Sequence, residues 1–371
     1  MSDHPDDVRT LAARGILRLR PETLDALPPC SPHHGVAFDR IEGMLLGLAI
    51  GDALGNTSES INPGKRAHSF GAIRNYLPNH HAGGRRIGLP SDDTQMAFWT
   101  LEHLLEHGRI VPQRLAELFC SRTIFGIGST VSAFRNQFRS GRPWYEACQP
   151  SAGNGALMRI APVLIPHAAA QQSTALWEDT IMAAAVTHND ASSIAACVAF
   201  AGMLWDLLAM DKAPAPQWWL DNYCARARLV EGEVKLTCRG APLDYTGPLW
   251  RLVDTHVRQA LAESITAVQA CGRWYSGAYL LETVPSALFI LALHGEDPEA
   301  AIVRAVNDTR DNDTIAAIVG AAVGALHGKA KLPQRWISGL SGRTAGNDDG
   351  RVFELIRAAE EKWGPAFSPS A

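Results

Sequence analysis

An almost wholly apolar helical run spans residues 315–328 and directly follows four polar residues at 311–314. A helix that is apolar on all sides is typical of the core of a sizeable protein, so this pattern predicts a buried helix. Small residues within it, among them Gly320 and Gly324, allow neighbouring helices to approach its backbone closely. The helix therefore carries two carboxylates and a hydroxyl into the interior at its N-terminus, where free N–H groups and the helix dipole favour negative charge.

A second helical pattern begins at Phe38 and carries four glycines at intervals of four residues, from Gly43 to Gly55. Glycine lowers helix propensity, so we expect the loss to be offset by close packing against another helix. The pattern ends near Gly55 and leaves Glu59 in the loop that follows.

The remaining chain also follows helical spacing for most of its length. Further helical patterns cover residues 8–18, 91–108, 111–122, 129–140, 177–187, 191–210, 249–270, 278–294, 298–308 and 350–363. Residues 61–90 have the composition of a loop, and residues 153–164 look like a glycine-flanked turn that enters a helix. Alternating strand patterns are nearly absent. We therefore expect an all-α fold with one domain over residues 39–371.

Two segments depart from this regular pattern. Residues 1–38 form an N-terminal extension with a proline-rich end, and two interpretations stay open for it: a loosely packed tail or a partner-binding arm. Residues near 211–247 are expected to form a variable insertion with a little strand. This insertion holds the pair Trp218 and Trp219, to which we assign no chemistry.

Composition and charge narrow the range of partners. The 371 residues are 46% hydrophobic and 19% charged, as in an ordinary globular enzyme. A formal net charge of −4 gives no electrostatic reason to expect nucleic acid or an anionic membrane as a partner. No apolar stretch stands out as a membrane span, and the acidic, polar N-terminus does not resemble a signal peptide. Seven scattered cysteines favour a reducing cytoplasm, so we expect a cytoplasmic protein.

The candidate chemistry lies in two acidic helix starts, at residues 91–93 and 311–314. Each start has two carboxylates and a hydroxyl, which are the oxygen ligands that a hard divalent cation prefers. A helix cap remains the alternative for either start, although a cap needs only one such side chain. If the two starts face each other, their carboxylates raise one another's pKa unless cations intervene. Two metal sites with bridging carboxylates would remove that conflict.

Six motifs in this order resemble the ADP-ribosylglycohydrolase family. They are GDALG at 51–55 with Glu59, SDDT at 91–94, GNGALMR at 153–159, TH at 187–188, ETVPSALF at 282–289 and DNDTIAAIVGAAVGA at 311–325. Each motif alone is weak, whereas the six in order, over residues 39–330, are highly specific. The resemblance implies an orthogonal multi-helix bundle with two Mg²⁺ or Mn²⁺ ions in a central cleft.

The resemblance also assigns roles to residues of this chain. It implies that the metal ligands are Ser91, Asp92, Asp93, Asp311, Asp313 and Thr314. It implies that Gly153, Asn154, Gly155, Met158 and His188 line the substrate cleft; for His188, a helix cap or core histidine is an open alternative. Glu59, Asp92 and Asp313 are the catalytic candidates, with Glu59 or Asp92 assisting proton transfer.

The activity implied is hydrolysis of the glycosidic bond between ADP-ribose and a protein side chain, with arginine as the favoured acceptor. One departure bears on the acceptor, because Gly126 stands where arginine-directed relatives often carry an aspartate. An alternative hypothesis is an antidote that blocks an ADP-ribosyltransferase toxin through residues 1–38. Both hypotheses name a protein partner, either an ADP-ribosylated substrate or a toxin.

Overall fold

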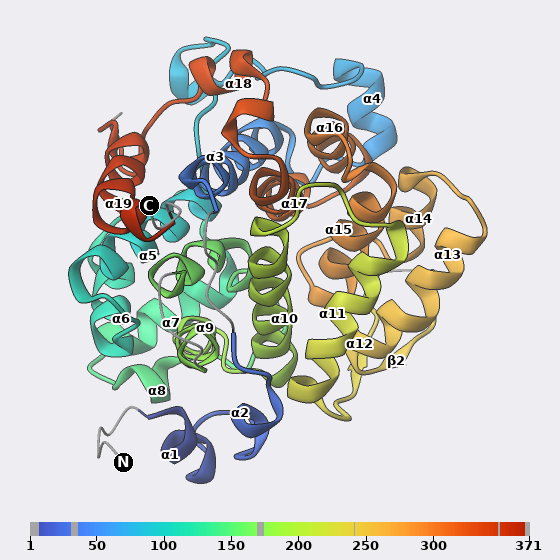
Figure 1. Ribbon diagram of the computed structural model, residues 1–371. Helices are drawn as coiled ribbons and strands as arrows, with labels where there is room; N and C mark the ends of the chain where they lie inside the picture. Colours follow the sequence, from blue (N-terminus) through green and yellow to red (C-terminus); the bar gives the residue numbers. More distant parts are fainter. Residues whose placement is uncertain (1–6, 31–35, 169–173, 241, 348, 368–371) are drawn as a thin grey trace.

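The structure is a computed structural model that describes residues 7–30, 36–168, 174–240, 242–347 and 349–367. Helices make up almost all of the regular structure, as Figure 1 shows. The α-helices are α1 (Val8–Ala13), α2 (Thr23–Ala26), α3 (Phe38–Gly55), α4 (Pro63–Phe70), α5 (Asp92–His107), α6 (Pro112–Ser121), α7 (Ser129–Arg139), α8 (Trp144–Ala147), α9 (Ala175–Ala185), α10 (Ala191–Leu208), α11 (Pro216–Glu231), α12 (Leu249–Leu252), α13 (Arg258–Ala262), α14 (Ala267–Arg273), α15 (Leu280–His294), α16 (Pro298–Asp308), α17 (Asn312–His327), α18 (Gln334–Gly339) and α19 (Arg351–Phe367).

Shorter elements connect these helices. The 3₁₀ turns are η1 (Asn56–Ser58), η2 (His80–Ala82), η3 (Leu157–Arg159), η4 (Ala161–His167) and η6 (Lys329–Lys331), and η5 (Val253–Val257) is a π-helical turn. The strands β1 (Leu236–Thr237) and β2 (Thr246–Gly247) pair in antiparallel fashion. The all-α class expected from the sequence is confirmed, with this small hairpin as an addition.

Helices α3 and α17 form the centre of the molecule and cross in backbone-to-backbone contact (Figure 1). A Cβ atom on Gly47 would overlap the carbonyl oxygen of Gly320, and one on Gly320 would overlap that of Gly47. At one end of this antiparallel contact Gly43 meets Gly324, and at the other Gly55 meets the backbone of Asp313. The glycines at intervals of four are therefore where the two backbones touch, as the sequence predicts.

The other long helices cover this pair. Helix α10 packs against α9, α11 and α17, and nearly all of its residues are buried. By length and composition alone α10 could span a membrane, which corrects the expectation that no segment would qualify. Its burial inside the fold is that of a core helix.

The described part of the N-terminal extension packs against the body of the protein. Leu11, Leu17 and Leu24 are buried and belong to the same apolar cluster as the central helices. The indole Nε1 of Trp177 donates to the carbonyl of Pro28 at 2.8 Å. These contacts differ from a loosely packed tail, and a partner-binding role for the extension stays a prediction.

Three segments differ in detail from the expected elements. Residues 61–90 contain α4 and η2 as well as the expected loop. Asn62 caps α4, because its side chain accepts a hydrogen bond from the N–H of Gly64 at 2.9 Å. The segment near 211–247 contains the little strand expected there and also α11, which packs on α10 and α15. The single helix expected over 249–270 is divided into α12, η5, α13 and the start of α14. Local capping and a π turn, which helical periodicity does not reveal, account for these differences.

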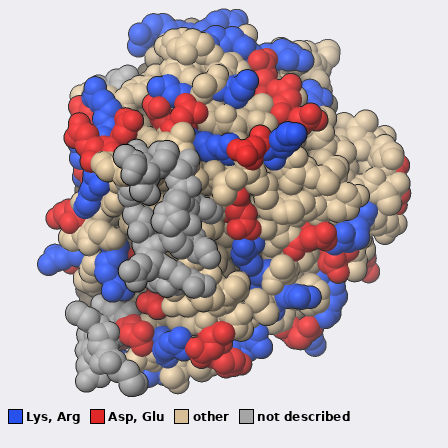
Figure 2. Space-filling view, viewed as in Figure 1, with Lys and Arg blue, Asp and Glu red and all other residues tan. Residues whose placement is uncertain are grey.

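Acidic and basic side chains are interspersed over most of the face in Figure 2, with Lys and Arg more frequent along its upper edge. This distribution agrees with the small net charge of −4. Salt bridges on the surface join many of these charges, for example Arg258 with Asp254 and Asp221.

Gly47→Ala is expected to destabilise the protein strongly, because the added methyl overlaps the backbone of Gly320 and the helices must separate. Overpacking of this kind costs about 1–3 kcal/mol or more. The measurement is the free energy of unfolding in urea.

Gly272→Ala is the matched control. Gly272 is exposed within α14, and a Cβ there meets no atom within 4 Å. We expect this variant to be unchanged or more stable by roughly 0.5–1 kcal/mol, because alanine favours a helix interior over glycine. Equal stability of the two variants would contradict the backbone contact between α3 and α17.

Candidate functional site

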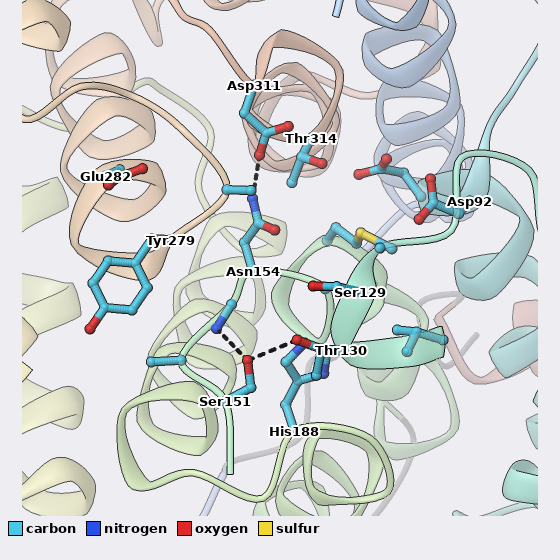
Figure 3. A pocket seen from close by; sticks show the side chains of 18 of the residues that line it. Asp92, Ser129, Thr130, Ser151, Asn154, His188, Tyr279, Glu282, Asp311 and Thr314 are labelled. Atoms are coloured by element: carbon cyan, nitrogen blue, oxygen red, sulfur yellow. Dashed lines mark hydrogen bonds between the residues drawn. The ribbon is translucent and has the colours of Figure 1, made fainter. Parts of the chain in front are cut away.

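A pocket of about 550 Å³ opens where the C-terminal end of α3 meets the N-terminal ends of α5 and α17. Figure 3 shows its walls, with Asp92 on one side, Tyr279 and Glu282 on the other, and Asp311 and Thr314 between them. Residues that the sequence places in separate motifs thus line one cavity. The predicted site residues that line it are Glu59, Asp92, Asp93, Gly153, Asn154, Gly155, Met158, His188, Asp311, Asp313 and Thr314.

Asp52 of α3 fixes the start of α5 beside the pocket. Its carboxylate is fully buried and accepts hydrogen bonds from the Ser91 N–H at 2.8 Å and the Ser91 hydroxyl at 2.6 Å. It also accepts from the N–H and hydroxyl of Thr94, at 3.1 and 2.5 Å, and from the side-chain amide of Asn56 at 3.0 Å. Ser91, a predicted metal ligand, therefore lies next to the pocket with its hydroxyl donated to Asp52.

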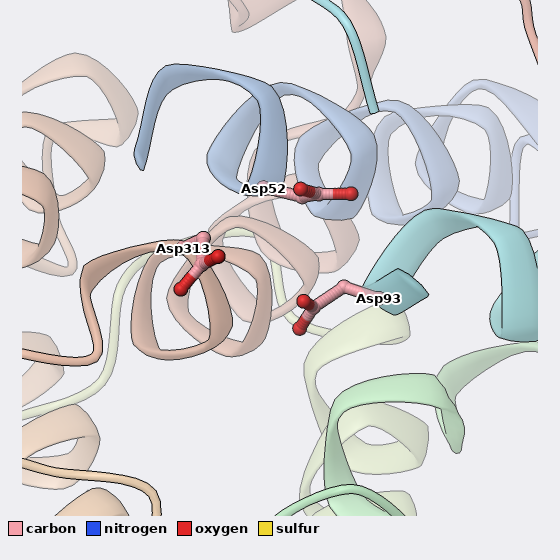
Figure 4. Close-up of side chains that lie close together, drawn as sticks. All are labelled: Asp52, Asp93 and Asp313. Carbon is pink, nitrogen blue, oxygen red and sulfur yellow. The ribbon is translucent and has the colours of Figure 1, made fainter. Parts of the chain in front are cut away.

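The two acidic helix starts do meet in space. One carboxylate oxygen from each of Asp52, Asp93 and Asp313 lies within 4.8 Å of the other two. Figure 4 shows these three side chains close together. Oxygens of Glu59, Asp311 and Asp313 form a second group by the same measure. Asp313 belongs to both groups, as expected of a carboxylate between two cation sites.

The hydrogen bonds separate the roles of these carboxylates. Asp52 is already satisfied by five donor groups, so we assign it mainly to orienting Ser91 and Thr94. Asp93 differs, because its Oδ1 is buried and has no hydrogen-bond partner in the described part of the chain. An orphaned buried oxygen next to other carboxylates suits a cation ligand.

Burial raises the pKa of every carboxyl group in this cluster that shows a shift, and repulsion between carboxylates raises the pKa of Asp93, Asp313, Asp92 and Glu59 further. Burial raises the pKa of Asp311 to about 6. Burial raises the pKa of Asp93 and Asp313 well above the ordinary value, and the neighbouring carboxylates raise it further. The pKa values of Asp92 and Glu59 are raised for the same reasons, burial first. Without a neutralising partner the cluster therefore favours bound protons.

The glycine-flanked turn at 153–155 supports both the acidic cluster and the pocket wall. The side-chain amide of Asn154 donates to Asp311 Oδ2 at 2.5 Å (Figure 3). It also donates to the Thr283 hydroxyl at 2.9 Å. The backbone of Gly153 forms a bridge with Tyr279. Asn154, predicted to line the cleft, thus also holds a predicted metal ligand in place.

His188 is buried and lines the pocket, so it has features of both open interpretations. Its ring packs against the same turn, since a Cβ on Gly155 would lie 2.9 Å from His188 Cε1. The neighbouring Asp190, rather than His188, caps α10 by accepting from two backbone N–H groups. A cap role for His188 is therefore wrong.

Gly126 faces Asp92 at the pocket wall. It adopts a positive φ of 67°, and a Cβ there would lie 3.2 Å from Asp92 Oδ1. An aspartate at this position would bring a further negative charge towards Asp92. The glycine that stands at position 126 in place of an aspartate therefore affects the immediate surroundings of Asp92, a predicted catalytic residue.

Sequence reasoning missed four residues of the site. Asp52 lies within the quoted GDALG motif, and a carboxylate inside an apolar, glycine-rich helix is itself a signal of a buried role. Glu282 begins the quoted ETVPSALF motif but is not among the predicted site residues; it lines the pocket, and burial raises its pKa to about 7. Arg239 and Tyr279 also line the pocket. Arg239 comes from the insertion, where no periodic pattern points to a site.

The metal-free protein is expected to become more stable as the pH falls through about 6. The folded-state pKa of Asp311 is about 6, above its ordinary value of 3.8, so the folded protein binds protons more tightly than the unfolded chain. Stability is then gained as the pH falls through this window and lost as it rises. Added Mg²⁺ or Mn²⁺ should stabilise the protein most near pH 7, by about 2.7 kcal/mol at 100 times its Kd. Thermal unfolding with EDTA and with metal measures both effects.

Asp313→Asn should remove the stabilisation by metal, while Asp297→Asn should retain it. Asp297 is an exposed N-cap of α16 and does not line the pocket, so the same substitution there serves as the control. A metal response that survives in Asp313→Asn would contradict the cation site.

Comparison with known proteins finds relatives of similar sequence over most of the chain. The chain is 27% identical over 317 residues to the ADP-ribosylarginine hydrolase Tri1 of Pseudomonas putida, covering 81% of this chain and 74% of Tri1. It is 26% identical over 309 residues to the ADP-ribosyl-dinitrogen reductase glycohydrolase of Rhodospirillum rubrum, covering 81% and 90%. It is 24% identical over 338 residues to human ADP-ribosylhydrolase ARH3, covering 82% and 90%.

The fold is also shared with a solved structure. A chain of an ADP-ribosylglycohydrolase-related protein complex superposes with a TM-score of 0.63 at 25% identity, covering 87% of this chain and 98% of that one. The sequence profile of the ADP-ribosylglycohydrolases matches residues 34–364, nearly the whole chain. The chain therefore belongs to the ADP-ribosylglycohydrolase family.

Proposed function

We propose that this protein is a metal-dependent hydrolase that removes ADP-ribose from arginine side chains of modified proteins. The observation that carries the proposal is the meeting of carboxylates from α3, α5 and α17 at the wall of an open pocket. Two relatives bear the name ADP-ribosylarginine hydrolase Tri1, at 27% and 26% identity. The seven cysteines are all free thiols, which suits action in a reducing cytoplasm.

The residues present fit hard divalent cations such as Mg²⁺ or Mn²⁺. Asp93 has a buried oxygen without a partner, and Asp313 lies in both carboxylate groups. We propose that the ions are held by these two residues together with Ser91, Asp92, Asp311 and Thr314. When bound, the ions would offset the negative charge, hold the ribose hydroxyls and lower the pKa of a water.

Glu59 is our candidate for moving the proton. It follows η1 at the C-terminal end of α3 and lines the pocket beside Asp311 and Asp313. Burial and the charge of Asp311 raise its pKa, which brings a carboxyl group closer to the range useful for proton transfer near neutral pH. Asp92 also lines the pocket and is the second candidate.

An acidic wall favours a cationic acceptor such as arginine. Glu59 and Glu282 line the pocket in addition to the predicted ligands. A guanidinium group pairs well with carboxylates, whereas a serine hydroxyl gains no charge interaction. With glycine rather than aspartate at position 126, the pocket has one carboxylate fewer. Serine is therefore the competing acceptor.

Arg239 is our candidate for binding the diphosphate of ADP-ribose. It is the only lysine or arginine that lines the pocket within the described ranges. Its guanidinium lies 4.0 Å from the centre of the Tyr279 ring. Figure 3 shows Tyr279 on the side of the pocket away from Asp92. Arg239 thus offers a positive charge for phosphate in a pocket that carboxylates otherwise line.

The decisive experiment measures release of free ADP-ribose from an arginine-ADP-ribosylated protein, with Mg²⁺ and with EDTA. We expect release with metal, and its loss with EDTA or in Asp93→Asn, because the orphaned Asp93 oxygen is needed to hold the cation. Asp297→Asn should retain activity. Release from a serine-linked substrate alone would overturn the acceptor, and no release from either by folded, metal-loaded protein would overturn the function.

Arg239→Gln is expected to raise KM by about tenfold or more with little change in kcat, because a charge-assisted hydrogen bond to phosphate contributes about 1.5–3 kcal/mol. Arg251→Gln is the matched control. Arg251 also stacks on an aromatic ring, that of Trp250 at 4.9 Å, but it does not line the pocket. An unchanged KM in Arg239→Gln would remove Arg239 from the substrate site.

A further inference from the structure

Arg159 carries a buried positive charge that the proposed chemistry does not use. It is fully buried at the end of η3, with its guanidinium carbon 4.7 Å from the centre of the Phe119 ring. No carboxylate forms an ion pair with it in the described part of the chain. Its Nε donates to the carbonyl of Gly155 at 3.1 Å, and its Nη2 donates to the Thr187 hydroxyl at 2.7 Å. A buried, unpaired charge is costly, so its hydrogen bonds should serve a purpose.

The Thr187 hydroxyl connects Arg159 to His188. Thr187 is fully buried, and its Oγ1 lies 2.8 Å from His188 Nδ1. Arginine is only a donor, so Thr187 must accept from Arg159. The hydroxyl hydrogen then has one remaining partner among the described residues, His188 Nδ1, and a buried hydroxyl hydrogen without a partner is unfavourable. His188 Nδ1 must therefore accept, which leaves the ring hydrogen on Nε2.

The surroundings also keep His188 neutral. Burial, and then the charge of Arg159, lower the pKa of His188 to about 3. Nε2 makes no hydrogen bond to the rest of the described protein, and it lies beside the glycine turn: a Cβ on Gly155 would stand 3.2 Å from it and one on Gly153 3.5 Å. Since His188 lines the pocket, its Nε2–H is a free donor there (Figure 3).

We propose that Arg159 and Thr187 are positioning residues that fix His188 as the tautomer with hydrogen on Nε2, so that this nitrogen donates to an oxygen of the bound ligand. The ligand class is one that offers a phosphate or sugar oxygen at this wall. The identification of that ligand as ADP-ribose rests on the proposed function, whereas the tautomer does not.

We call the series of hydrogen bonds from Arg159 through Thr187 to His188 the relay. The relay gives a reason for a buried arginine that has no acidic partner. A carboxylate next to Thr187 would accept the hydroxyl hydrogen, and Thr187 would then accept from His188 Nδ1, which reverses the tautomer. Because arginine can only donate, Arg159 makes every hydrogen bond in the relay point from Arg159 towards the pocket. The glycines at 153 and 155 leave space for the ring edge that presents Nε2.

The test combines ¹⁵N NMR of the histidine rings with calorimetric binding of ADP-ribose to the metal-loaded protein. His188→Gln identifies the His188 signals by their loss. In the wild type we expect the Nε2–H tautomer, and in Thr187→Val we expect that tautomer to lose its dominance and ADP-ribose to bind roughly tenfold more weakly, as for one lost hydrogen bond to a charged group. Thr187→Ser keeps the hydroxyl and should restore both properties.

Thr180→Val is the matched control, because Thr180 is a fully buried threonine of α9 whose hydroxyl donates to the carbonyl of Leu176 at 2.7 Å, away from His188. It should leave the tautomer and the affinity unchanged. Arg159→Met, provided that circular dichroism shows it folded, should also cause the Nε2–H tautomer of His188 to lose its dominance, as expected for Thr187→Val.

A wild-type ring with hydrogen on Nδ1, or a Thr187→Val protein with the wild-type tautomer, overturns the relay. A relay that behaves as expected in a protein that binds no ADP-ribose supports the relay and contradicts the proposed function.

Discussion

The site depends on the backbone contact between α3 and α17. Where Gly47 meets Gly320, no side chain separates the two helices, so their relative position is fixed by main-chain atoms that cannot change rotamer. At the end of the same contact Gly55 admits the backbone of Asp313, and the side chain of Asn312 donates to the carbonyl of Gly55 at 3.1 Å. The C-terminal end of one helix is thereby held against the N-terminal end of the other. Asp52 and Asp313 are brought together by packing rather than by attraction.

Helix packing holds the carboxylates together although their negative charges repel one another, so their ionised state is electrostatically unfavourable. The carboxylates of Asp93, Asp311 and Asp313 are buried close to one another, and their raised pKa values express that cost. Protons or cations relieve it, and the rigid helix contact prevents relief by separation. The same rigidity favours a preorganised site, because packing fixes the backbones that carry Asp52 and Asp313.

The sequence predicts the central part of this arrangement well, for physical reasons. Glycines at intervals of four and an apolar helix behind acidic residues are local patterns, and each has one favourable structural solution. The meeting of the two acidic helix starts, by contrast, depends on tertiary packing, and the sequence supports it only through the family resemblance. Asp52 was missed because its role arises from donors on another helix, at Ser91 and Thr94.

The insertion shows the limit of periodicity as a guide to function. Helix α11 lies inside it and packs on the body, although Trp218, Trp219 and several prolines obscure the helical pattern of that segment. Arg239 reaches the pocket from the irregular chain after β1. Arg239 lines the pocket because the insertion packs back against the rest of the protein at this point. Such a long-range contact is not encoded by any local sequence pattern.

The N-terminal extension and the His188 wall of the pocket are mechanically joined. The Asn189 side chain donates to the carbonyl of Ile16 at 2.7 Å and accepts from the N–H of Arg18 at 2.9 Å. Its neighbour His188 is held from the other side by Thr187. Deleting residues 1–38 would therefore release one support of the pocket as well as any partner-binding surface. A partner-binding role of the extension is better separated from catalysis by substitutions at its exposed positions, such as Arg14 and Glu22, which leave the anchor at Asn189 intact.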